Sequence, residues 1–259
     1  MSYYPHYKPE IVFITGATGD FGHAMARRFA ALGSKLILHG RSDAKLESLE
    51  KDLGAETLSL CFDMNDRDAM ERAIESLPQE FAAIDVLINN AGGAHGQEAA
   101  YEASLADWDE MIAVNVTALA RLTRLVLPGM IARKRGHIIN IGSIAGTYPY
   151  PGGHVYCAAK AFTAQFSLAL RADLQGKNIR VTNLEPGMVE TQFSKVRFKG
   201  DEDKAAAVYA GANPMSADDV AESAIWVATL PEHFNVNRIE MMPTTQAFGP
   251  LTVYREKAA

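Results

Sequence analysis

Short apolar runs and longer amphipathic stretches alternate along almost the whole chain. The apolar runs have the length and β-branched content of buried strands, and they cover residues 11–14, 35–39, 57–62, 84–88, 137–141, 179–184 and 238–241. In the stretches between them, apolar residues recur every three or four positions, as in helices, at residues 21–32, 43–53, 66–77, 104–135, 155–175 and 217–229. The pattern therefore predicts strands and helices in regular alternation.

Glycine and proline mark the ends of several predicted helices. Gly33 and Gly54 each follow one helix and Pro78 follows another. Pro128 and Gly129 lie inside the long helical stretch, so we expect a kink or break there.

Alternating strands and helices indicate βαβ units, whose right-handed crossovers build a parallel sheet with helices on both faces. No shift in composition and no linker rich in proline or serine divides the chain. We therefore predict one α/β domain over residues 1–259, a Rossmann-type doubly wound parallel sheet. Residues 190–216 have little periodicity, and long irregular segments in compact domains are often functional, so we expect a substrate lid there.

Composition narrows the class of protein. The chain is 48% hydrophobic with a net charge of −6, and its longest basic run is residues 133–135, so a nucleic-acid partner is not expected. Two cysteines, Cys61 and Cys157, are too few for a disulfide framework. The first ten residues lack the features of a signal peptide, and no run approaches the roughly 18 apolar residues of a membrane span. We expect a cytoplasmic protein without a membrane partner.

Tyr156 and Lys160 are the first candidates for chemistry. In a helix, their spacing of four residues places both side chains on one face, where the ammonium would favour the phenolate. Ser143 stands at the end of a predicted strand, where a loop opens. Taken alone, the pair is better explained as a packed tyrosine beside a solvated lysine.

A glycine-rich turn follows the first predicted strand. Residues 15–22 read TGATGDFG and lead into a helix, an arrangement that can hold a pyrophosphate on backbone N–H groups. An acidic residue that would bind a ribose hydroxyl is expected after the second strand, but Arg41 and Ser42 stand there. A guanidinium suits a 2′-phosphate, so NADP is favoured over NAD; the alternative for Arg41 is a solvated loop cation.

These motifs together resemble the short-chain dehydrogenase/reductase family over essentially the whole chain. Besides the turn and the Y-x-x-x-K pair, residues 89–92 (NNAG), Asn115, Ser143 and residues 186–187 (PG) stand in that family's order and spacing. Residues 127–130, 196–201 and 240–243 are similar to the branch of NADP-dependent 3-hydroxy acid dehydrogenases, serine 3-dehydrogenases and malonic semialdehyde reductases.

The resemblance implies a role for each catalytic candidate. Tyr156 would be the acid/base, Lys160 would lower its pKa and bind the nicotinamide ribose, Ser143 would hold the substrate oxygen, and Asn115 would anchor a water that relays the proton. Asparagine is a poor helix former, and Asn115 lies in a strongly helical stretch, which favours a special role. The alternative for Asn115 is a buried amide whose hydrogen bonds are satisfied.

The resemblance also implies the residues around NADP(H): Gly16, Ala17, Thr18, Gly19, Asp20, Phe21, Arg41, Ser42, Asp63, Met64, Asn90, Ala91, Gly92, Tyr156, Lys160, Pro186, Gly187, Val189 and Thr191. One of them departs from the family, which usually has glycine at the position of Asp20. A carboxylate there could repel a pyrophosphate. We expect it instead to turn outward as an N-cap and satisfy first-turn N–H groups.

For the substrate we expect Ser143, Tyr148, Tyr150 and Arg197, because a lid guanidinium can pair with a carboxylate. The predicted reaction is hydride transfer between NADP(H) and a small 3-hydroxy acid or its semialdehyde, of the serine, 3-hydroxypropionate or 3-hydroxyisobutyrate type, with no metal. Two alternatives stay open: a bulkier or neutral ketone or alcohol, such as a steroid, a sugar or a sulfonated aldehyde, and a non-catalytic dinucleotide sensor. The resemblance further implies a homotetramer in which residues 243–255 pack near a neighbouring subunit.

Overall fold

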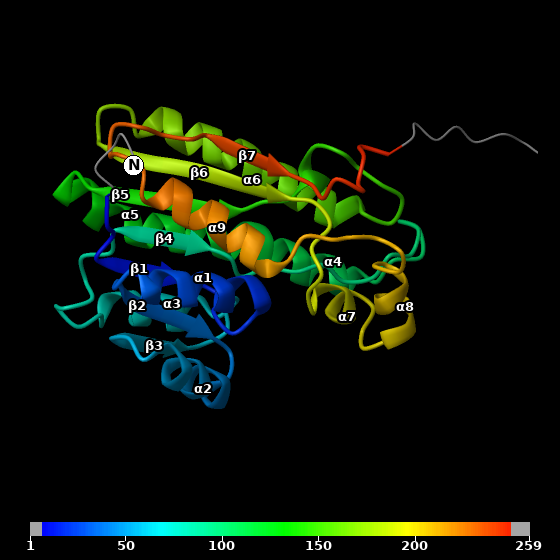
Figure 1. Ribbon diagram of the computed structural model, residues 1–259, viewed down its shortest axis with the longest axis horizontal. Coiled ribbons are helices and arrows are strands. Elements are labelled where there is room, and N and C mark those ends of the chain that lie inside the picture. Colours follow the sequence, from blue (N-terminus) through cyan, green and yellow to red (C-terminus); the bar gives the residue numbers. More distant parts are fainter. Residues whose placement is uncertain (1–6, 250–259) are drawn as a thin grey trace, which may run out of the picture.

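The computed structural model of the protein describes residues 7–249. Seven strands form one sheet in the order β3-β2-β1-β4-β5-β6-β7, and every neighbouring pair is parallel (Figure 1). The strands are β1 (Ile11–Ile14), β2 (Lys35–Gly40), β3 (Thr57–Cys61), β4 (Val86–Asn89), β5 (Gly136–Ile141), β6 (Ile179–Pro186) and β7 (Arg238–Met241). The predicted doubly wound parallel sheet is confirmed.

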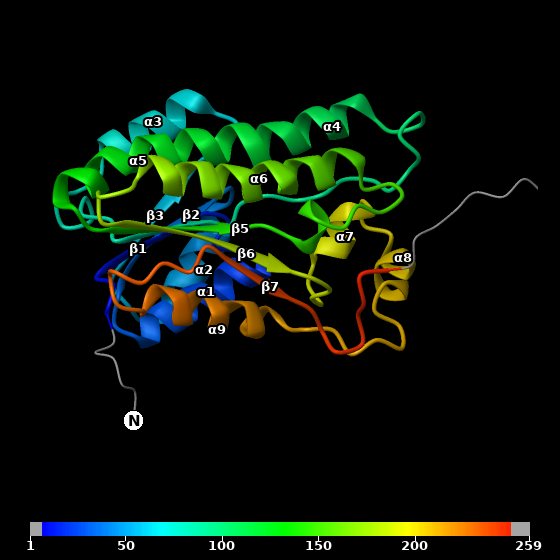
Figure 2. The ribbon, with the colours of Figure 1, turned by 90° about the horizontal axis from the view of Figure 1, so that it is seen from above.

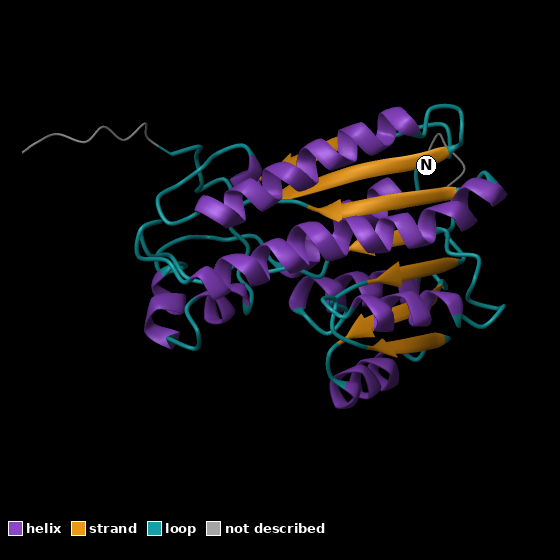
Figure 3. Ribbon diagram, turned by 180° about the vertical axis from the view of Figure 1, so that it is seen from behind, coloured by secondary structure: helices purple, strands orange, loops and turns teal. Residues whose placement is uncertain are grey.

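Helices cover both faces of the sheet, as Figure 2 shows from above. On one face lie α1 (Asp20–Ala31), α2 (Asp43–Leu53) and α9 (Ala217–Ala228). On the other lie α3 (Arg67–Glu75), α4 (Leu105–Ile112), α5 (Leu119–Arg133) and α6 (His154–Asp173). Two short helices, α7 (Phe193–Arg197) and α8 (Glu202–Ala207), lie beyond the ends to which the strand arrows point (Figures 1 and 3).

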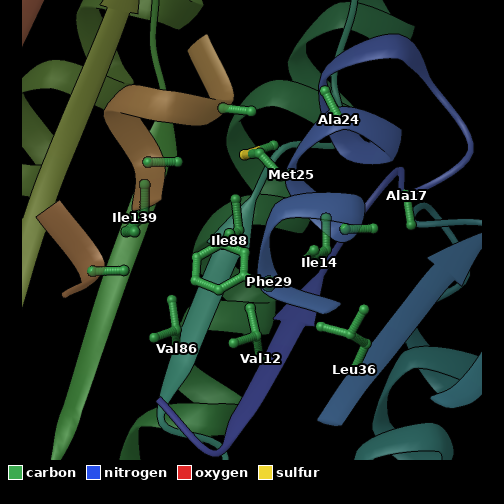
Figure 4. Close-up of a cluster of buried hydrophobic side chains, with 14 of the residues drawn as sticks. Val12, Ile14, Ala17, Ala24, Met25, Phe29, Leu36, Val86, Ile88 and Ile139 are labelled. Atoms are coloured by element: carbon green, nitrogen blue, oxygen red, sulfur yellow. The ribbon is translucent and has the colours of Figure 1, made fainter. Parts of the chain in front are cut away.

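Strand β1 shows how one strand supplies two cores. All four of its residues are buried, and alternate side chains point to opposite faces. Val12 and Ile14 join the cluster beneath α1 and α9, which Figure 4 shows around Phe29, while Ile11 and Phe13 join the cluster beneath α3, α5 and α6. Burial on both faces explains why these strands read as continuous apolar runs.

The long helical stretch is interrupted at a different place from the one predicted. It is not broken at Pro128, which lies inside α5; the helix continues to Arg133 and ends at Lys134, whose φ is 52°. The interruption is a π-helical segment, η1 (Ala113–Ala118), between α4 and α5. Prolines are visible in a sequence, whereas a π-helical turn depends on the partners that its unpaired backbone groups find.

By length and composition alone, the continuous helical segment Leu105–Arg133 could cross a membrane. Its most apolar window of 18 residues has a mean hydropathy of 1.3, so the expectation that no stretch approaches a membrane span is wrong. In the fold this helix lies on the sheet, with Leu122 and Val126 buried against it. Packing of a helix on a sheet accounts for the apolar composition.

Residues 190–216, expected to be irregular, contain the two short helices α7 and α8. Helices of five and six residues are too short to show amphipathic periodicity in a sequence. An isolated bridge between Val189 and Met215, outside the strands of the sheet, joins the two ends of the segment. Of the predicted interface segment 243–255, residues 250–255 lie outside the described residues.

We expect Phe29→Ala to destabilise the fold by about 3–5 kcal/mol, because Phe29 is fully buried between α1 and the sheet. Phe29→Leu keeps most of the volume and should cost about 1 kcal/mol. Denaturation at one protein concentration measures both. Equal losses for the two variants would contradict the packing described here.

Candidate active site

The predicted site residues gather at one edge of the sheet because the strands are parallel. β1, β2, β4, β5 and β6 all end at this edge, and the glycine turn, Arg41, Asn90, Ser143 and Gly187 follow them directly. The chain order reverses between β1 and β4, and in open α/β sheets such a point opens a crevice for a ligand. The fold therefore brings residues far apart in sequence to one place.

The glycine turn is shaped by close backbone contacts. Gly16 has a φ of +61°, and a Cβ on Gly22 would lie 2.3 Å from the Gly16 carbonyl oxygen and 2.6 Å from the Ala17 Cα. Gly19 is the N-cap of α1 and carries no side chain that would occupy the free N–H groups of the first turn. This open cradle at a helix N-terminus fits a pyrophosphate.

Asn90 and Thr15 hold the turn against β4. The Asn90 side-chain amide donates to the carbonyl oxygens of Thr15 at 2.8 Å and Gly16 at 3.1 Å. The Thr15 hydroxyl accepts from the backbone N–H groups of Asn90 and Ala91, both at 2.9 Å. In this structure Asn90 therefore supports the turn; its predicted contact with a ribose stays a prediction.

Other predicted cofactor residues lie along the same edge. Arg41 is exposed directly after β2, and Ser42 is the N-cap of α2. Asp63 is exposed, and the next residue in the chain, Met64, is buried. On the far side, Gly187 donates its backbone N–H to Met241, and the Thr191 hydroxyl accepts from Phe193 N–H at 3.2 Å.

The four catalytic candidates come from three elements: the 3₁₀ turn η2 (Ile144–Gly146) after β5, helix α6 and, for Asn115, the segment η1. Ser143 follows β5 and caps η2, while Tyr156 and Lys160 lie on the buried face of α6. A Cβ on Gly146 would lie 2.8 Å from the Lys160 carbonyl carbon, so η2 packs directly on the α6 backbone. This contact fixes Ser143 relative to Tyr156 and Lys160.

Asn115 lies in the π-helical segment η1 and is 2% exposed. Its side-chain amide donates to the carbonyl oxygens of Met111 at 2.9 Å and Gly93 at 3.0 Å. Asn115 Oδ1 and Lys160 Nζ both lie next to Gly92. Because glycine has no side chain, none fills the space between these two polar atoms. The poor helix propensity of asparagine pointed to this position, but the π-helical turn itself was not foreseen.

Burial raises the pKa of the Tyr156 phenol, and the nearby Tyr150 and Cys157 act in the same direction. The Ser143 hydroxyl and the positive charge of Arg197 oppose the rise. Lys160 was expected to lower this pKa. In the structure its ammonium instead donates to the Ile141 carbonyl at 2.9 Å and lies 5.7 Å from the Tyr156 ring centroid.

Lys160 is itself 8% exposed, and burial lowers its pKa to about 8 from an ordinary 10.5. At pH 7 the ammonium is therefore mostly charged. One of its three N–H donors is used by Ile141, which leaves two for a bound ligand.

Helix α7, in the segment 190–216 that was predicted to be a lid, lies over the phenol of Tyr156. The ring of Phe193, on α7, lies 5.7 Å from that of Tyr156. Arg197, also on α7, donates to the Gly96 carbonyl at 3.1 Å and to the Tyr150 hydroxyl at 2.9 Å. Its second terminal nitrogen, Nη2, is buried and has no hydrogen-bond partner among residues 7–249.

Tyr148 does not share this arrangement. Its hydroxyl donates to Glu240 at 3.2 Å, and its ring lies 4.8 Å from that of Phe248. Tyr150, two residues later, is the tyrosine that meets Arg197. A substrate contact by Tyr148 stays a prediction.

The expected N-cap role of Asp20 is wrong. Gly19 is the N-cap, and Asp20 is the first residue of α1. The Asp20 carboxylate accepts a hydrogen bond from the backbone N–H of Gln192, at the start of α7, at 2.6 Å. The sequence cannot show this contact, because the two residues are 172 positions apart.

Comparison with known proteins agrees with this geometry. A family model described as short chain dehydrogenase matches residues 10–202, which is most of the chain. The chain belongs to the short-chain dehydrogenase family. The resemblance inferred from the motifs is thus confirmed.

Among the relatives of this dehydrogenase chain, the NADP-dependent 3-hydroxy acid dehydrogenase of Salmonella typhi is 52% identical over 246 residues, covering 95% of this chain and 99% of that protein. The serine 3-dehydrogenase of Agrobacterium fabrum is 47% identical over 245 residues, with coverages of 95% and 98%. The solved closed form of a serine dehydrogenase complexed with NADP+ is 50% identical, with a TM-score of 0.93 and coverages of 95% and 100%.

The sequence did not point to two residues that support the dehydrogenase site. His39 is buried, and its Nδ1 accepts from Gly16 N–H at 3.3 Å while its Nε2 lies 3.0 Å from the Phe62 carbonyl. Burial lowers the pKa of His39 to about 4, so the neutral ring can accept this hydrogen bond. Phe193 covers Tyr156. A polar residue in an apolar strand was the one available signal for His39, and Phe193 had none.

We expect Gly22→Ala to weaken NADPH binding at least tenfold and to destabilise the protein by about 1–3 kcal/mol, because its Cβ would overlap the turn backbone. Gly129→Ala is the control: Gly129 is exposed on α5, away from the turn, and its Cβ would meet only the flexible end of the Arg133 side chain, at 3.3 Å. Fluorescence titration and thermal unfolding measure both effects. If both variants bind NADPH equally well, the turn is not the cradle.

We expect Lys160→Met to abolish turnover without lowering thermal stability at pH 7. In the wild type, the pKa of Lys160 is lowered by burial to about 8. Keeping the buried ammonium charged at pH 7 therefore lowers the stability of the folded protein by roughly 3 kcal/mol. As pH rises from 8 to 10.5 the folded protein loses this proton before the unfolded chain does, so wild type should gain stability relative to the variant. Exposed Lys177→Met should show no such trend. A stability difference that does not change with pH would contradict the pKa shift.

Proposed function

We propose that this protein is an NADP(H)-dependent oxidoreductase that interconverts a small 3-hydroxy acid and its semialdehyde or 3-oxo form. Serine, 3-hydroxypropionate and 3-hydroxyisobutyrate represent the substrate type. The observation that carries the substrate class is Arg197, whose buried Nη2 faces no acceptor within the described residues while its charge acts on Tyr156.

Arg197 is suited to hold a carboxylate close to the reacting carbon. Contacts with Gly96 and Tyr150 hold the guanidinium in place, and its carbon lies 5.2 Å from the Tyr150 ring centroid. Tyr150 accepts from Arg197, so its own hydroxyl proton stays free to donate. A buried guanidinium N–H and a phenol O–H beside Tyr156 match a carboxylate a short distance from a carbonyl.

Tyr156 supplies the proton in the reduction direction. NADPH, when bound, supplies the hydride. Because burial raises the pKa of Tyr156, its phenol is protonated at neutral pH and can donate to the substrate oxygen. Ser143, close enough to act on that phenol, holds the same oxygen, and the charge of Arg197 favours the phenolate that remains.

The chain's own residues fit NADP(H). The glycine cradle and the first turn of α1 suit the pyrophosphate, and the free N–H donors of Lys160 suit ribose hydroxyls. Arg41 is an exposed cation after β2, where a 2′-phosphate would lie in a fold of this kind. The NADP dependence in the names of the relatives supports this assignment.

We also propose a cytoplasmic homotetramer. Large apolar side chains that are exposed in the single chain support association; they include Trp226 on α9, 51% exposed, and Leu168 on α6, 48% exposed.

We expect Arg197→Ala to raise KM for a 3-hydroxy acid about 10- to 100-fold, as expected from losing a charge-assisted hydrogen bond of about 1.5–3 kcal/mol. Arg197→Lys keeps the charge but not the planar fork, so it should recover only part of the affinity. Steady-state kinetics at 340 nm with 3-hydroxypropionate and L-serine measure the effect.

A neutral secondary alcohol serves as the substrate control, because its KM should change little when Arg197 is replaced. Lys195→Ala, on the exposed side of the same helix, is the matched variant, since Lys195 pairs with Glu202 and does not reach the site. Equal effects of Arg197→Ala on acid and alcohol would assign Arg197 to lid stability and overturn the substrate proposal.

A further inference from the structure

Asp20 joins two parts of the site that are otherwise separate. It is the first residue of α1, directly after the N-cap Gly19 of the glycine turn. Its Oδ2 accepts from the backbone N–H of Gln192 at 2.6 Å. Gln192 is the N-cap of α7, the helix that carries Phe193 and Arg197. One side chain thus connects the pyrophosphate cradle to the lid.

The lid has a second attachment at its other end. Arg197 and Gly96 exchange backbone and side-chain hydrogen bonds of 3.0 and 3.1 Å, and Lys199 pairs with Asp107 at 2.8 Å. These contacts tie the end of α7 to the loop before α4, and the residue Lys199 after it to α4 itself. The hydrogen bond from Gln192 to Asp20 ties the start of α7 to the glycine turn. The next residue in the chain, Phe193, covers Tyr156.

We propose that Asp20 is a positioning residue that latches the lid to the glycine turn and thereby sets how fast NADP(H) leaves the enzyme. The kinetic part of this inference rests on the proposed NADP(H) chemistry, whereas the latch itself does not. Glycine, the usual residue of the family at this position, has no side chain to make the contact.

Two effects of Asp20 on a bound pyrophosphate have opposite signs. Its negative charge weakens phosphate binding, while its contact with Gln192 holds the lid over the site. Asp20→Asn removes the charge but keeps an oxygen that can accept from Gln192 N–H. Asp20→Gly removes both. Comparing these two variants therefore separates the latch from the charge.

Hydrogen exchange of the protein without added nucleotide tests the latch alone. The amide of Gln192 should exchange about five- to tenfold faster in Asp20→Gly than in wild type, as expected for the loss of roughly 1–1.4 kcal/mol from one partly exposed hydrogen bond to a charged acceptor. Asp20→Asn should stay within about twofold of wild type. Asp68→Gly, which removes an exposed first-turn carboxylate from α3, is the matched control and should leave this amide unchanged. Unchanged exchange in Asp20→Gly would overturn the latch.

Stopped-flow displacement of NADPH tests its consequence. Asp20→Gly should release NADPH about five- to tenfold faster than Asp20→Asn, by the same hydrogen-bond estimate. If NADPH leaves Asp20→Gly as slowly as Asp20→Asn, or more slowly, the kinetic role is overturned. The remaining effect of Asp20 would then be a negative charge that weakens phosphate binding. If wild type itself binds no NADPH, the proposed function fails, while the exchange measurement still decides the latch.

Discussion

Parallel pairing of β1, β4, β5 and β6 is the constraint on which the rest of the structure depends. It requires every crossover to return the chain to the same end of the sheet, so each strand delivers its following residues to one edge. A buried hydrogen bond of 2.8 Å from Asn89 to Asn140 joins the ends of β4 and β5 at this edge. The glycine turn, Asn90 and Ser143 therefore start from the ends of strands that are hydrogen-bonded into one sheet.

Burial is the main cause of the pKa shifts of Tyr156 and Lys160. Tyr156 and Lys160 are 9% and 8% exposed, and desolvation is the largest cause of the raised pKa of the phenol and the cause of the lowered pKa of the ammonium. Both shifts favour neutral groups, so positive charge brought in by the lid changes the balance at Tyr156. Arg197 supplies such a charge, and it opposes the rise in the pKa of Tyr156.

The lid is held by contacts of different kinds at its two ends. At the Arg197 end, backbone and guanidinium hydrogen bonds to Gly96 also build the site that suits a carboxylate. At the Gln192 end, the contact comes from Asp20 on the pyrophosphate turn. The proposed carboxylate site and the proposed latch therefore lie at opposite ends of one short helix.

The sequence by itself determined the sheet and the order of the elements, and it named Asn115, Ser143, Tyr156 and Lys160 as catalytic candidates, because apolar periodicity and motif spacing are local properties. Tertiary structure alone decided the π-helical turn at Asn115, the choice of Tyr150 over Tyr148 as the partner of Arg197, and the contact of Asp20 with the lid. Each of these depends on residues that meet only after the sheet has brought distant segments together. Asp20 and Gln192, 172 positions apart, are neighbours because β1 and β6 end at the same edge.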